Sequence, residues 1–164
     1  MVRIRLRLRP VEPRDRSFLY DVFCSTRPDV SRSNLPEAEK EYFLRMQFHA
    51  QDTHYRAACP EAQFAVVCLG NKKIGRIYTD RRRDEIRIMD IALMPEFRGR
   101  GFGSQLVKDV IAEAGLSRKA VRIHVELDSR QIQFYQRLGF VKIKEVPPRQ
   151  LMEWSADSGI VLAE

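Results

Sequence analysis

The sequence predicts an α/β fold in which about seven strands form one mixed sheet flanked by about four helices. Several short segments alternate apolar and polar side chains, which is typical of half-buried strands. Other segments repeat apolar side chains with the period of an amphipathic helix. Glycine and proline separate the two kinds of segment. Along the chain the segments run in the order β-α-α-β-β-β-α-β-α-β-β.

Residues 2–9 predict the first strand, because apolar side chains and arginines alternate strictly there. The side expected to face the core holds four apolar residues, Val2, Ile4, Leu6 and Leu8. The other side holds four arginines, Arg3, Arg5, Arg7 and Arg9. These arginines either keep a sheet edge from pairing with other strands or contact an anion or a partner.

Two helices are expected next. Asp15 is placed to cap the first, which ends before Pro28. Its core-facing residues are Phe18, Leu19, Val22 and Phe23. The second runs from about Leu35 to Arg56, and Asn34 with Glu37 resembles a capping box at its start. Its aromatic side chains either pack in the core or form the wall of a ligand pocket; they are Tyr42, Phe43, Phe48 and Tyr55.

Strands over residues 63–69, 73–79 and 85–94, joined by short turns, indicate an antiparallel meander. Gly70-Asn71 is a good hairpin turn between the first two. A helix from Leu106 to Ala114 then ends at Gly115, and a strand covers Ala120 to Leu127. Asp128 with Gln131 is expected to cap the last helix. Two closing strands follow, over residues 140–146 and 151–154.

Composition restricts the class of protein. The 164 residues contain 29 Lys and Arg against 22 Asp and Glu, a net charge of +7, and their number fits a single domain over residues 1–164. The longest uncharged apolar run, Phe64 to Leu69, is far too short to cross a membrane. Three cysteines without a C-x-x-C pair favour a reducing compartment, so we expect a cytoplasmic protein.

Residues 94–104 are the segment in which we expect a functional site. Gly99, Gly101 and Gly103 alternate with larger residues just before a helix, and Arg98 and Arg100 add what we expect to be mobile positive charge. Free backbone N–H groups at a helix N-terminus bind phosphates, so the segment predicts a pyrophosphate site. A tight turn with solvated arginines is the alternative. The segment lacks the lysine of a Walker loop, and Ser104 replaces the last glycine of the dinucleotide fingerprint.

Arg98, Gly101 and Gly103 match the pattern R-x-x-G-x-G. This resembles the pyrophosphate loop of the GCN5-related N-acetyltransferase (GNAT) superfamily. Arg9-Pro10, the stretch 91–96 and the stretch 124–140 resemble further family segments, and the last of these resembles its second motif. The resemblance covers nearly the whole chain. It implies a GNAT-type twisted sheet, mostly antiparallel, and acetyl-CoA as co-substrate with no metal.

The resemblance also implies site residues. Those implied for the cofactor are Ile91, Ala92, Leu93, Arg98, Gly99, Arg100, Gly101, Phe102, Gly103, Ser104, Asp128 and Tyr135. Two positions depart from the family pattern, since Asp128 stands where the family has asparagine and Gln131 where it has alanine.

The implied reaction is direct attack of an amine on the acetyl-CoA thioester. The resemblance makes Tyr135 the general acid that protonates the leaving thiolate; packing with Ile132 and Leu138 is the alternative. A phenol pKa of about 10, above that of a thiol at about 8.5, suits a neutral donor. A backbone N–H near residues 91–93 is expected to stabilise the oxyanion. The candidate general bases are Glu85, Asp90, His124 and Glu126, or a water chain acts instead.

The acceptor is expected to be a primary amine of a small molecule or of a protein. A net charge of +7 disfavours polycationic acceptors. Two other functions stay open, a catalytically inactive acyl-CoA-binding regulator and, less favoured because no known motif is present, a basic nucleic-acid-binding module. No membrane partner is expected, and a homodimer is left open.

Overall fold

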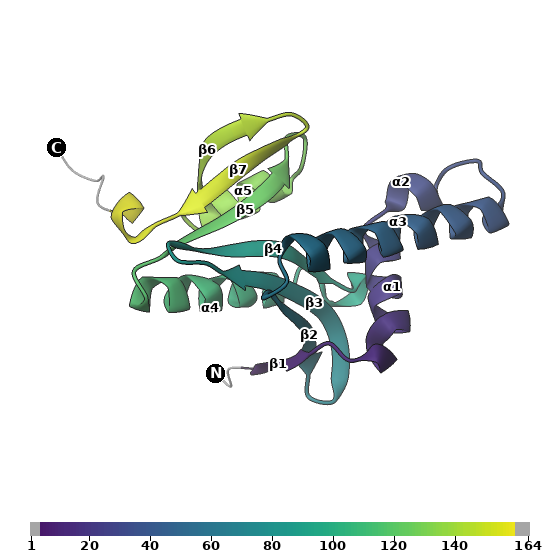
Figure 1. The fold of residues 1–164 in the computed structure, drawn as a ribbon, viewed down its shortest axis with the longest axis horizontal. Coiled ribbons are helices and arrows are strands. Elements are labelled where there is room, and N and C mark those ends of the chain that lie inside the picture. Colours follow the sequence, from purple (N-terminus) through teal and green to yellow (C-terminus); the bar gives the residue numbers. More distant parts are fainter. Residues whose placement is uncertain (1–3, 160–164) are drawn as a thin grey trace. The chain divides into compact units, whose positions relative to one another are not determined.

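The structure is a computed structural model that describes residues 4–159. Twelve elements carry the fold (Figure 1). The strands are β1 (Leu6–Pro10), β2 (Gln63–Leu69), β3 (Lys72–Arg81), β4 (Glu85–Leu93), β5 (Ala120–Glu126), β6 (Val141–Val146) and β7 (Arg149–Trp154). The helices are α1 (Arg16–Ser25), α2 (Pro28–Ser31), α3 (Glu37–Ala58), α4 (Phe102–Leu116) and α5 (Gln131–Arg137). The predicted helices correspond to α1, α3, α4 and α5, and α2 is an additional short helix.

The strands form one seven-stranded sheet in the order β1-β2-β3-β4-β5-β7-β6. β1 and β2 pair antiparallel, as do β5 with β7 and β6 with β7, whereas β4 and β5 pair parallel. The β4–β5 connection contains a helix, α4, as is usual for a crossover between parallel strands. The prediction of an α/β fold with a mixed, mostly antiparallel sheet is confirmed.

The described chain forms two compact units, one from residues 4–78 and 90–100 and one from residues 79–89 and 101–159. In the first unit, α1, α2 and α3 enclose an apolar cluster of Leu19, Phe23, Val30, Leu44 and Phe48. Phe48 contacts the rings of Tyr20 and Phe23. The predicted inner face of the first helix is therefore correct, and one aromatic of the second helix packs in the core.

The first strand does not bury its apolar side as predicted. Leu8 is 52% exposed, whereas the Arg9 side chain is only 17% exposed. Arg9 turns inward because its guanidinium forms two hydrogen bonds of 2.8 Å with the carboxylate of Asp15. Val2 and Arg3, which belong to the predicted pattern, lie outside the described residues.

The predicted helix caps are wrong, although the helices exist. The Asp15 side chain accepts hydrogen bonds from Arg9, Lys73 and the backbone N–H of Glu12 instead of capping α1. α3 begins after Pro36 without a side-chain cap, so Asn34 has no such role. A buried carboxylate needs charged and hydrogen-bonding partners, and for Asp15 these are Arg9, Lys73 and the N–H of Glu12.

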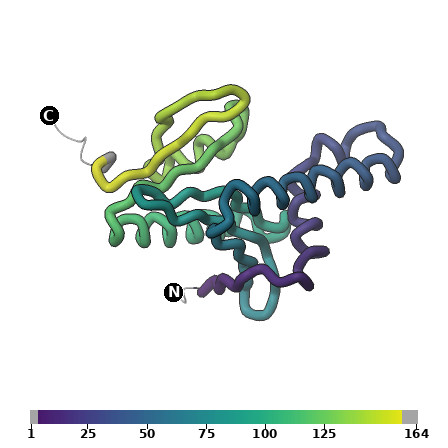
Figure 2. Tube along the Cα trace, viewed as in Figure 1, coloured from purple at the N-terminus to yellow at the C-terminus, as the bar shows by residue number. Residues whose placement is uncertain are grey.

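In the second unit, α4 packs on β5 and the hairpin of β6 and β7 follows α5 (Figures 1 and 2). Val107 and Ala114 on α4, with Val121 and Ile123 on β5, are buried. α4 passes Gly115 and ends at Leu116, one residue later than expected. At the start of α5, Ser129 Oγ accepts a hydrogen bond from the N–H of Gln131, so Ser129 replaces Asp128 in the predicted capping position.

No helix within residues 4–159 is long and apolar enough to cross a membrane.

Candidate active site

The glycine-rich segment links the end of β4 to the start of α4. A short 3-10 helix, Pro95–Phe97, follows β4. Gly99 and Gly101 then take positive φ angles of 70° and 83°, and Gly101 stands directly before the first residue of α4. A side chain at either glycine would meet open space, so the backbone conformation and not crowding requires glycine there. These two turns bring the chain into the helix N-terminus, where N–H groups lack helical partners.

Arg98 is anchored and not mobile, which corrects the sequence prediction. Its Nε donates to the carbonyl oxygen of Leu93 (2.9 Å) and its Nη2 donates to Ser25 Oγ (3.0 Å). The side chain therefore ties the glycine-rich segment to the end of β4 and to the last residue of α1. Arg100 lies with its guanidinium 5.5 Å from the ring centre of Phe97, on the exposed surface.

Three of the residues implied for the cofactor form the C-terminal end of β4. They are Ile91, Ala92 and Leu93. A Cβ at Gly75 on β3 would lie 2.3 Å from the carbonyl oxygen of Ala92. Only glycine permits this close approach of the two strands. The sequence analysis did not single out Gly75, although an isolated glycine inside a strand pattern is a usual sign of close backbone approach.

Asp90, a candidate base, is held by neighbours in the first unit. Its carboxylate accepts hydrogen bonds from Arg76 Nη2 (2.9 Å) and from the hydroxyl of Tyr55 (3.1 Å). Arg76 is buried, and it also donates to Gln51 on α3. This network joins α3 to β3 and β4. The sign of this network in the sequence is Arg76, which stands among the apolar residues of β3, but the network was not predicted.

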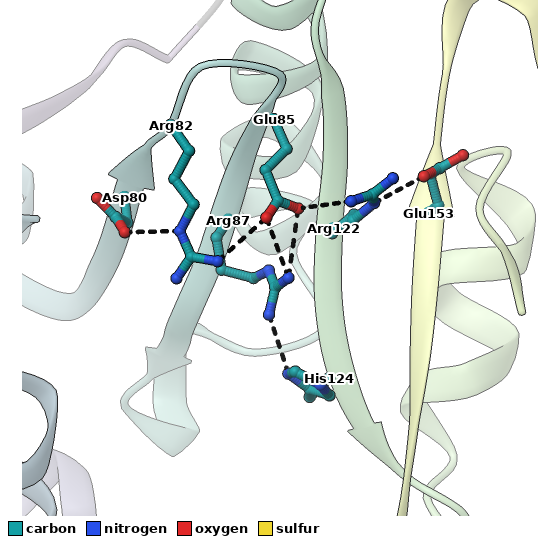
Figure 3. A network of polar contacts seen from close by, with 7 residues as sticks. All are labelled: Asp80, Arg82, Glu85, Arg87, Arg122, His124 and Glu153. Carbon is teal, nitrogen blue, oxygen red and sulfur yellow. Dashed lines mark hydrogen bonds and ion pairs between the residues drawn. The ribbon is translucent and has the colours of Figure 1, made fainter. Parts of the chain in front are cut away.

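Glu85, a second candidate base, is buried and bonded to three arginines in the second unit (Figure 3). Arg82 and Arg87 each donate at 3.1 Å, and Arg122 forms an ion pair at 3.5 Å. Arg122 in turn bonds to Glu153 on β7 at 2.7 Å. The lone pairs of Glu85 are thus engaged, which argues against its removing a proton from an acceptor.

His124 joins the same network, with its Nδ1 3.3 Å from Arg87 Nη1 (Figure 3). Arginine can only donate, so Nδ1 accepts and the ring proton sits on Nε2. Burial and the positive charges of Arg87 and Arg149 lower the pKa of His124 below its usual value of 6.5. The ring is therefore neutral at pH 7, but Arg87 occupies the nitrogen that would act as a base.

The other predicted residues of the second unit differ in burial. Glu126 and Asp128 are exposed, at the end of β5 and in the following turn. Tyr135 on α5 is buried, and its ring makes edge-to-face contacts with Phe134 and Phe140. Gly103 and Ser104 lie in the first turn of α4 beside buried Phe102. Of the predicted residues, the structure thus links His124 with Glu85, through Arg87.

Within residues 4–159, no three His, Cys, Asp or Glu side chains are grouped so that they could hold a metal ion.

The model of the GNAT acetyltransferase domain matches residues 60–142, just over half of the chain. This chain belongs to the GNAT acetyltransferase family. The matched residues include β4, the glycine-rich segment, β5 and α5, so every residue proposed for the cofactor lies within the match.

One relative of this GNAT chain is the uncharacterized N-acetyltransferase CgeE of Bacillus subtilis (strain 168). The two are 26% identical over 110 residues, which are 66% of this chain and 41% of the relative. The chain therefore spans less than half the length of that protein.

Solved structures share the GNAT fold at low sequence identity. The PaiA N-acetyltransferase of Thermoplasma acidophilum, in complex with coenzyme A, is 16% identical with a TM-score of 0.69, covering 92% of this chain and 99% of that one. An acetyltransferase of Thermus thermophilus is 21% identical with a TM-score of 0.66, covering 92% and 96%. The fold is therefore that of known acetyltransferases.

Proposed function

We propose that this GNAT chain transfers an acetyl group from acetyl-CoA to a primary amine by direct attack. The observation that carries the proposal is the backbone between β4 and α4. Two glycines with positive φ lead directly into the N-terminus of a long helix. Such a turn presents successive N–H groups and the positive end of the helix dipole to an anion. A coenzyme A pyrophosphate is the anion that the family membership favours.

The residues proposed to bind the cofactor would have different roles. The N–H groups of Gly101, Gly103 and Ser104 would bind the pyrophosphate oxygens. Arg100 would add positive charge, whereas Arg98 would hold the segment in shape through Leu93 and Ser25. The backbone of residues 91–93 would pair with the arm that carries the thioester, and one of its N–H groups would stabilise the oxyanion.

In the proposed reaction, the amine nitrogen attacks the thioester carbonyl carbon and forms the new C–N bond. The C–S bond then breaks and its electron pair stays on sulfur. The hydroxyl of Tyr135 gives its proton to that sulfur, and the amine loses a proton to a base. Among the candidate bases, Glu85, Asp90 and His124 have their acceptor atoms engaged, so we assign the base to Glu126 or to a water.

Replacement of Tyr135 tests the proposed chemistry. Because Tyr135→Phe removes only the hydroxyl, we expect kcat for CoA release to fall on the order of 100-fold. Acetyl-CoA should still stabilise the variant, by about 2.7 kcal/mol at a hundred times its Kd. Acceptors are found first with the wild type, by screening amines for CoA release. Tyr20→Phe removes a phenol from the α1 core and should leave kcat unchanged.

Three results would each contradict one part of the proposed function. Wild-type turnover by Tyr135→Phe would exclude Tyr135 as the acid. Cofactor stabilisation with no CoA release from any amine would favour an acyl-CoA-binding regulator. A melting temperature that does not respond to millimolar acetyl-CoA would reject the cofactor site itself.

A further inference from the structure

α3 has two apolar faces, and one of them is uncovered. Leu44 and Phe48 face the core of the first unit. On the other side Tyr42 is 69% exposed and Met46 is 51% exposed. Phe43 borders this face, and Leu35 extends it just before the helix begins. A helix that is apolar on two sides normally buries both, so the outer face is typical of an interaction surface.

One flank of this outer face carries charges in a particular order. Glu41 and Arg45 form one ion pair a turn apart (2.9 Å), and Asp52 and Arg56 form another (3.2 Å). The flank therefore reads acid, base, acid, base from the start of the helix to its end. Read from the end of the helix to its start, as in an antiparallel neighbour, the order is base, acid, base, acid. When two such helices lie side by side and antiparallel, this flank of one copy meets the same flank of the other, and opposite charges match at every position. In a parallel twofold pair this flank would instead face the other flank of the second copy.

We propose that the outer face of α3 binds a second copy of this chain, with the two α3 helices antiparallel. The register that pairs Glu41 with Arg56 of the second copy also pairs Arg45 with Asp52 of the second copy. The twofold axis then passes close to Phe48 and His49 along the helix. Such an interface is isologous, because each copy contributes the same surface.

The apolar residues fit the same register. Large side chains occupy the first half of the outer face and small ones the second half, where Ala50, Thr53 and Ala57 are exposed. In this register Ala50 of the second copy lies one residue along the helix from the position opposite Met46, and Thr53 of the second copy lies two residues from the position opposite Tyr42. Large side chains thus meet small ones, which lets two helices approach to normal packing distance.

The two arginines of the flank are already held in place. The guanidinium of Arg45 lies 4.5 Å from the ring centre of Tyr20, and that of Arg56 lies 4.6 Å from the ring centre of Phe64. Both side chains therefore lose less conformational freedom on association than free arginines would. The proposal concerns only the first unit and does not depend on the acetyltransferase function.

Two charge-exchanged variants test the register. The first carries Glu41→Arg with Arg45→Glu, and the second carries Asp52→Arg with Arg56→Glu. Each keeps an opposite-charge pair within its own helix, so the fold is preserved. In either homodimer all four contacts between copies join like charges, and we expect the dimer Kd to rise by a factor on the order of 100. A mixture of the two variants restores opposite charges at every contact and should form a heterodimer.

Sedimentation equilibrium gives the state of each protein, and native mass spectrometry identifies the heterodimer. Exchange of another exposed ion pair, by Lys142→Glu with Glu145→Lys on β6, should leave the wild-type dimer intact. Met46→Asp, which keeps all four flank charges, should give a folded monomer whose melting temperature does not depend on protein concentration. Circular dichroism checks that each variant is folded.

Four results would overturn the proposal. A wild type that is monomeric at its highest soluble concentration excludes the dimer. Charge-exchanged variants that stay dimeric, or a dimeric Met46→Asp, place the interface elsewhere. Two folded, monomeric variants that do not associate when mixed exclude the antiparallel register and leave the face to another partner.

Discussion

Asp15 shows how one residue decides the orientation of its neighbours. It is completely buried, and it accepts hydrogen bonds from Arg9 and Lys73 and from the N–H of Glu12. Because a buried charge requires such partners, Arg9 turns inward and Leu8 is exposed, whereas Leu6 and Arg7 keep the expected pattern. The same need removes Asp15 from its predicted capping role.

Asp15→Asn should destabilise the protein by about 3 kcal/mol at pH 7, because Arg9 loses its buried partner. The hydrogen bonds from Arg9 lower the pKa of Asp15 well below its usual value of 3.8. Its stabilising effect is therefore fully present above that value and declines as the pH falls below about 4. Urea unfolding between pH 3 and 7 should show a constant difference from wild type above pH 5 that shrinks below pH 4. A difference that grows on acidification would contradict this assignment.

The residue types of the predicted bases did not show which of them has an acceptor atom available to remove a proton. Glu85, Asp90 and His124 were reasonable from the sequence, because each lies on a strand near the implied site. The structure shows each of them bonded to an arginine, in two separate networks. The arginines themselves, Arg76 on β3 and Arg87 on β4, are visible within the predicted strands, but the linear sequence does not show which side chain each of them binds.

At the scale of elements, the turn before α4 was predictable in detail. The glycines before the helix were singled out because glycine can take a positive φ, and Gly99 and Gly101 do so, whereas Gly103 lies within the helix. This succeeded because the requirement is local: only the backbone between β4 and α4 decides it. The caps of α1, α3 and α5 were predicted less well. Asp15 bonds to Arg9 and Lys73 instead of capping α1, α3 begins after Pro36, and Ser129 accepts the hydrogen bond expected for Asp128.

Gly101→Ala separates folding from cofactor binding. The positive φ should cost the apo-protein about 1 kcal/mol. If the proposed pyrophosphate site is correct, the added methyl group should also weaken acetyl-CoA binding at least tenfold. Gly70→Ala in the β2–β3 turn is the matched control, because Gly70 also has a positive φ and open space around it. Thermal melting with and without acetyl-CoA compares the two variants. Equal loss of cofactor binding in both would show that the β4–α4 turn has no special role.

For the molecule as a whole, we expect the net charge of +7 to disfavour polycationic acceptors. The two arginines of the glycine-rich segment differ in what they do, since Arg98 is bonded internally and Arg100 is on the surface. Most of the positive charge lies outside this segment. It repels polycations over distances of about 10 Å at 0.1 M salt.

Acceptors of different charge should respond to salt to different extents. For a polyamine, kcat/KM should be low and should rise several-fold with added salt, because salt screens its repulsion from the chain. For a zwitterionic amino acid the change should be small. Both are measured by CoA release at constant acetyl-CoA. A polyamine whose kcat/KM falls with salt would show that a local acidic site overrides the net charge.

The order of the elements, the family and the glycine turn before α4 follow from the sequence alone. Each depends on information carried by neighbouring residues: apolar periodicity, motif spacing, and glycine where φ is positive. The tertiary structure alone decided which charged residues are free to act. It paired Arg9 with Asp15, Arg76 with Asp90 and Arg87 with Glu85 and His124, and it left one face of α3 uncovered. The physical reason is that the partner of a buried charge is set by distance in space, which residues far apart in the chain acquire only on folding.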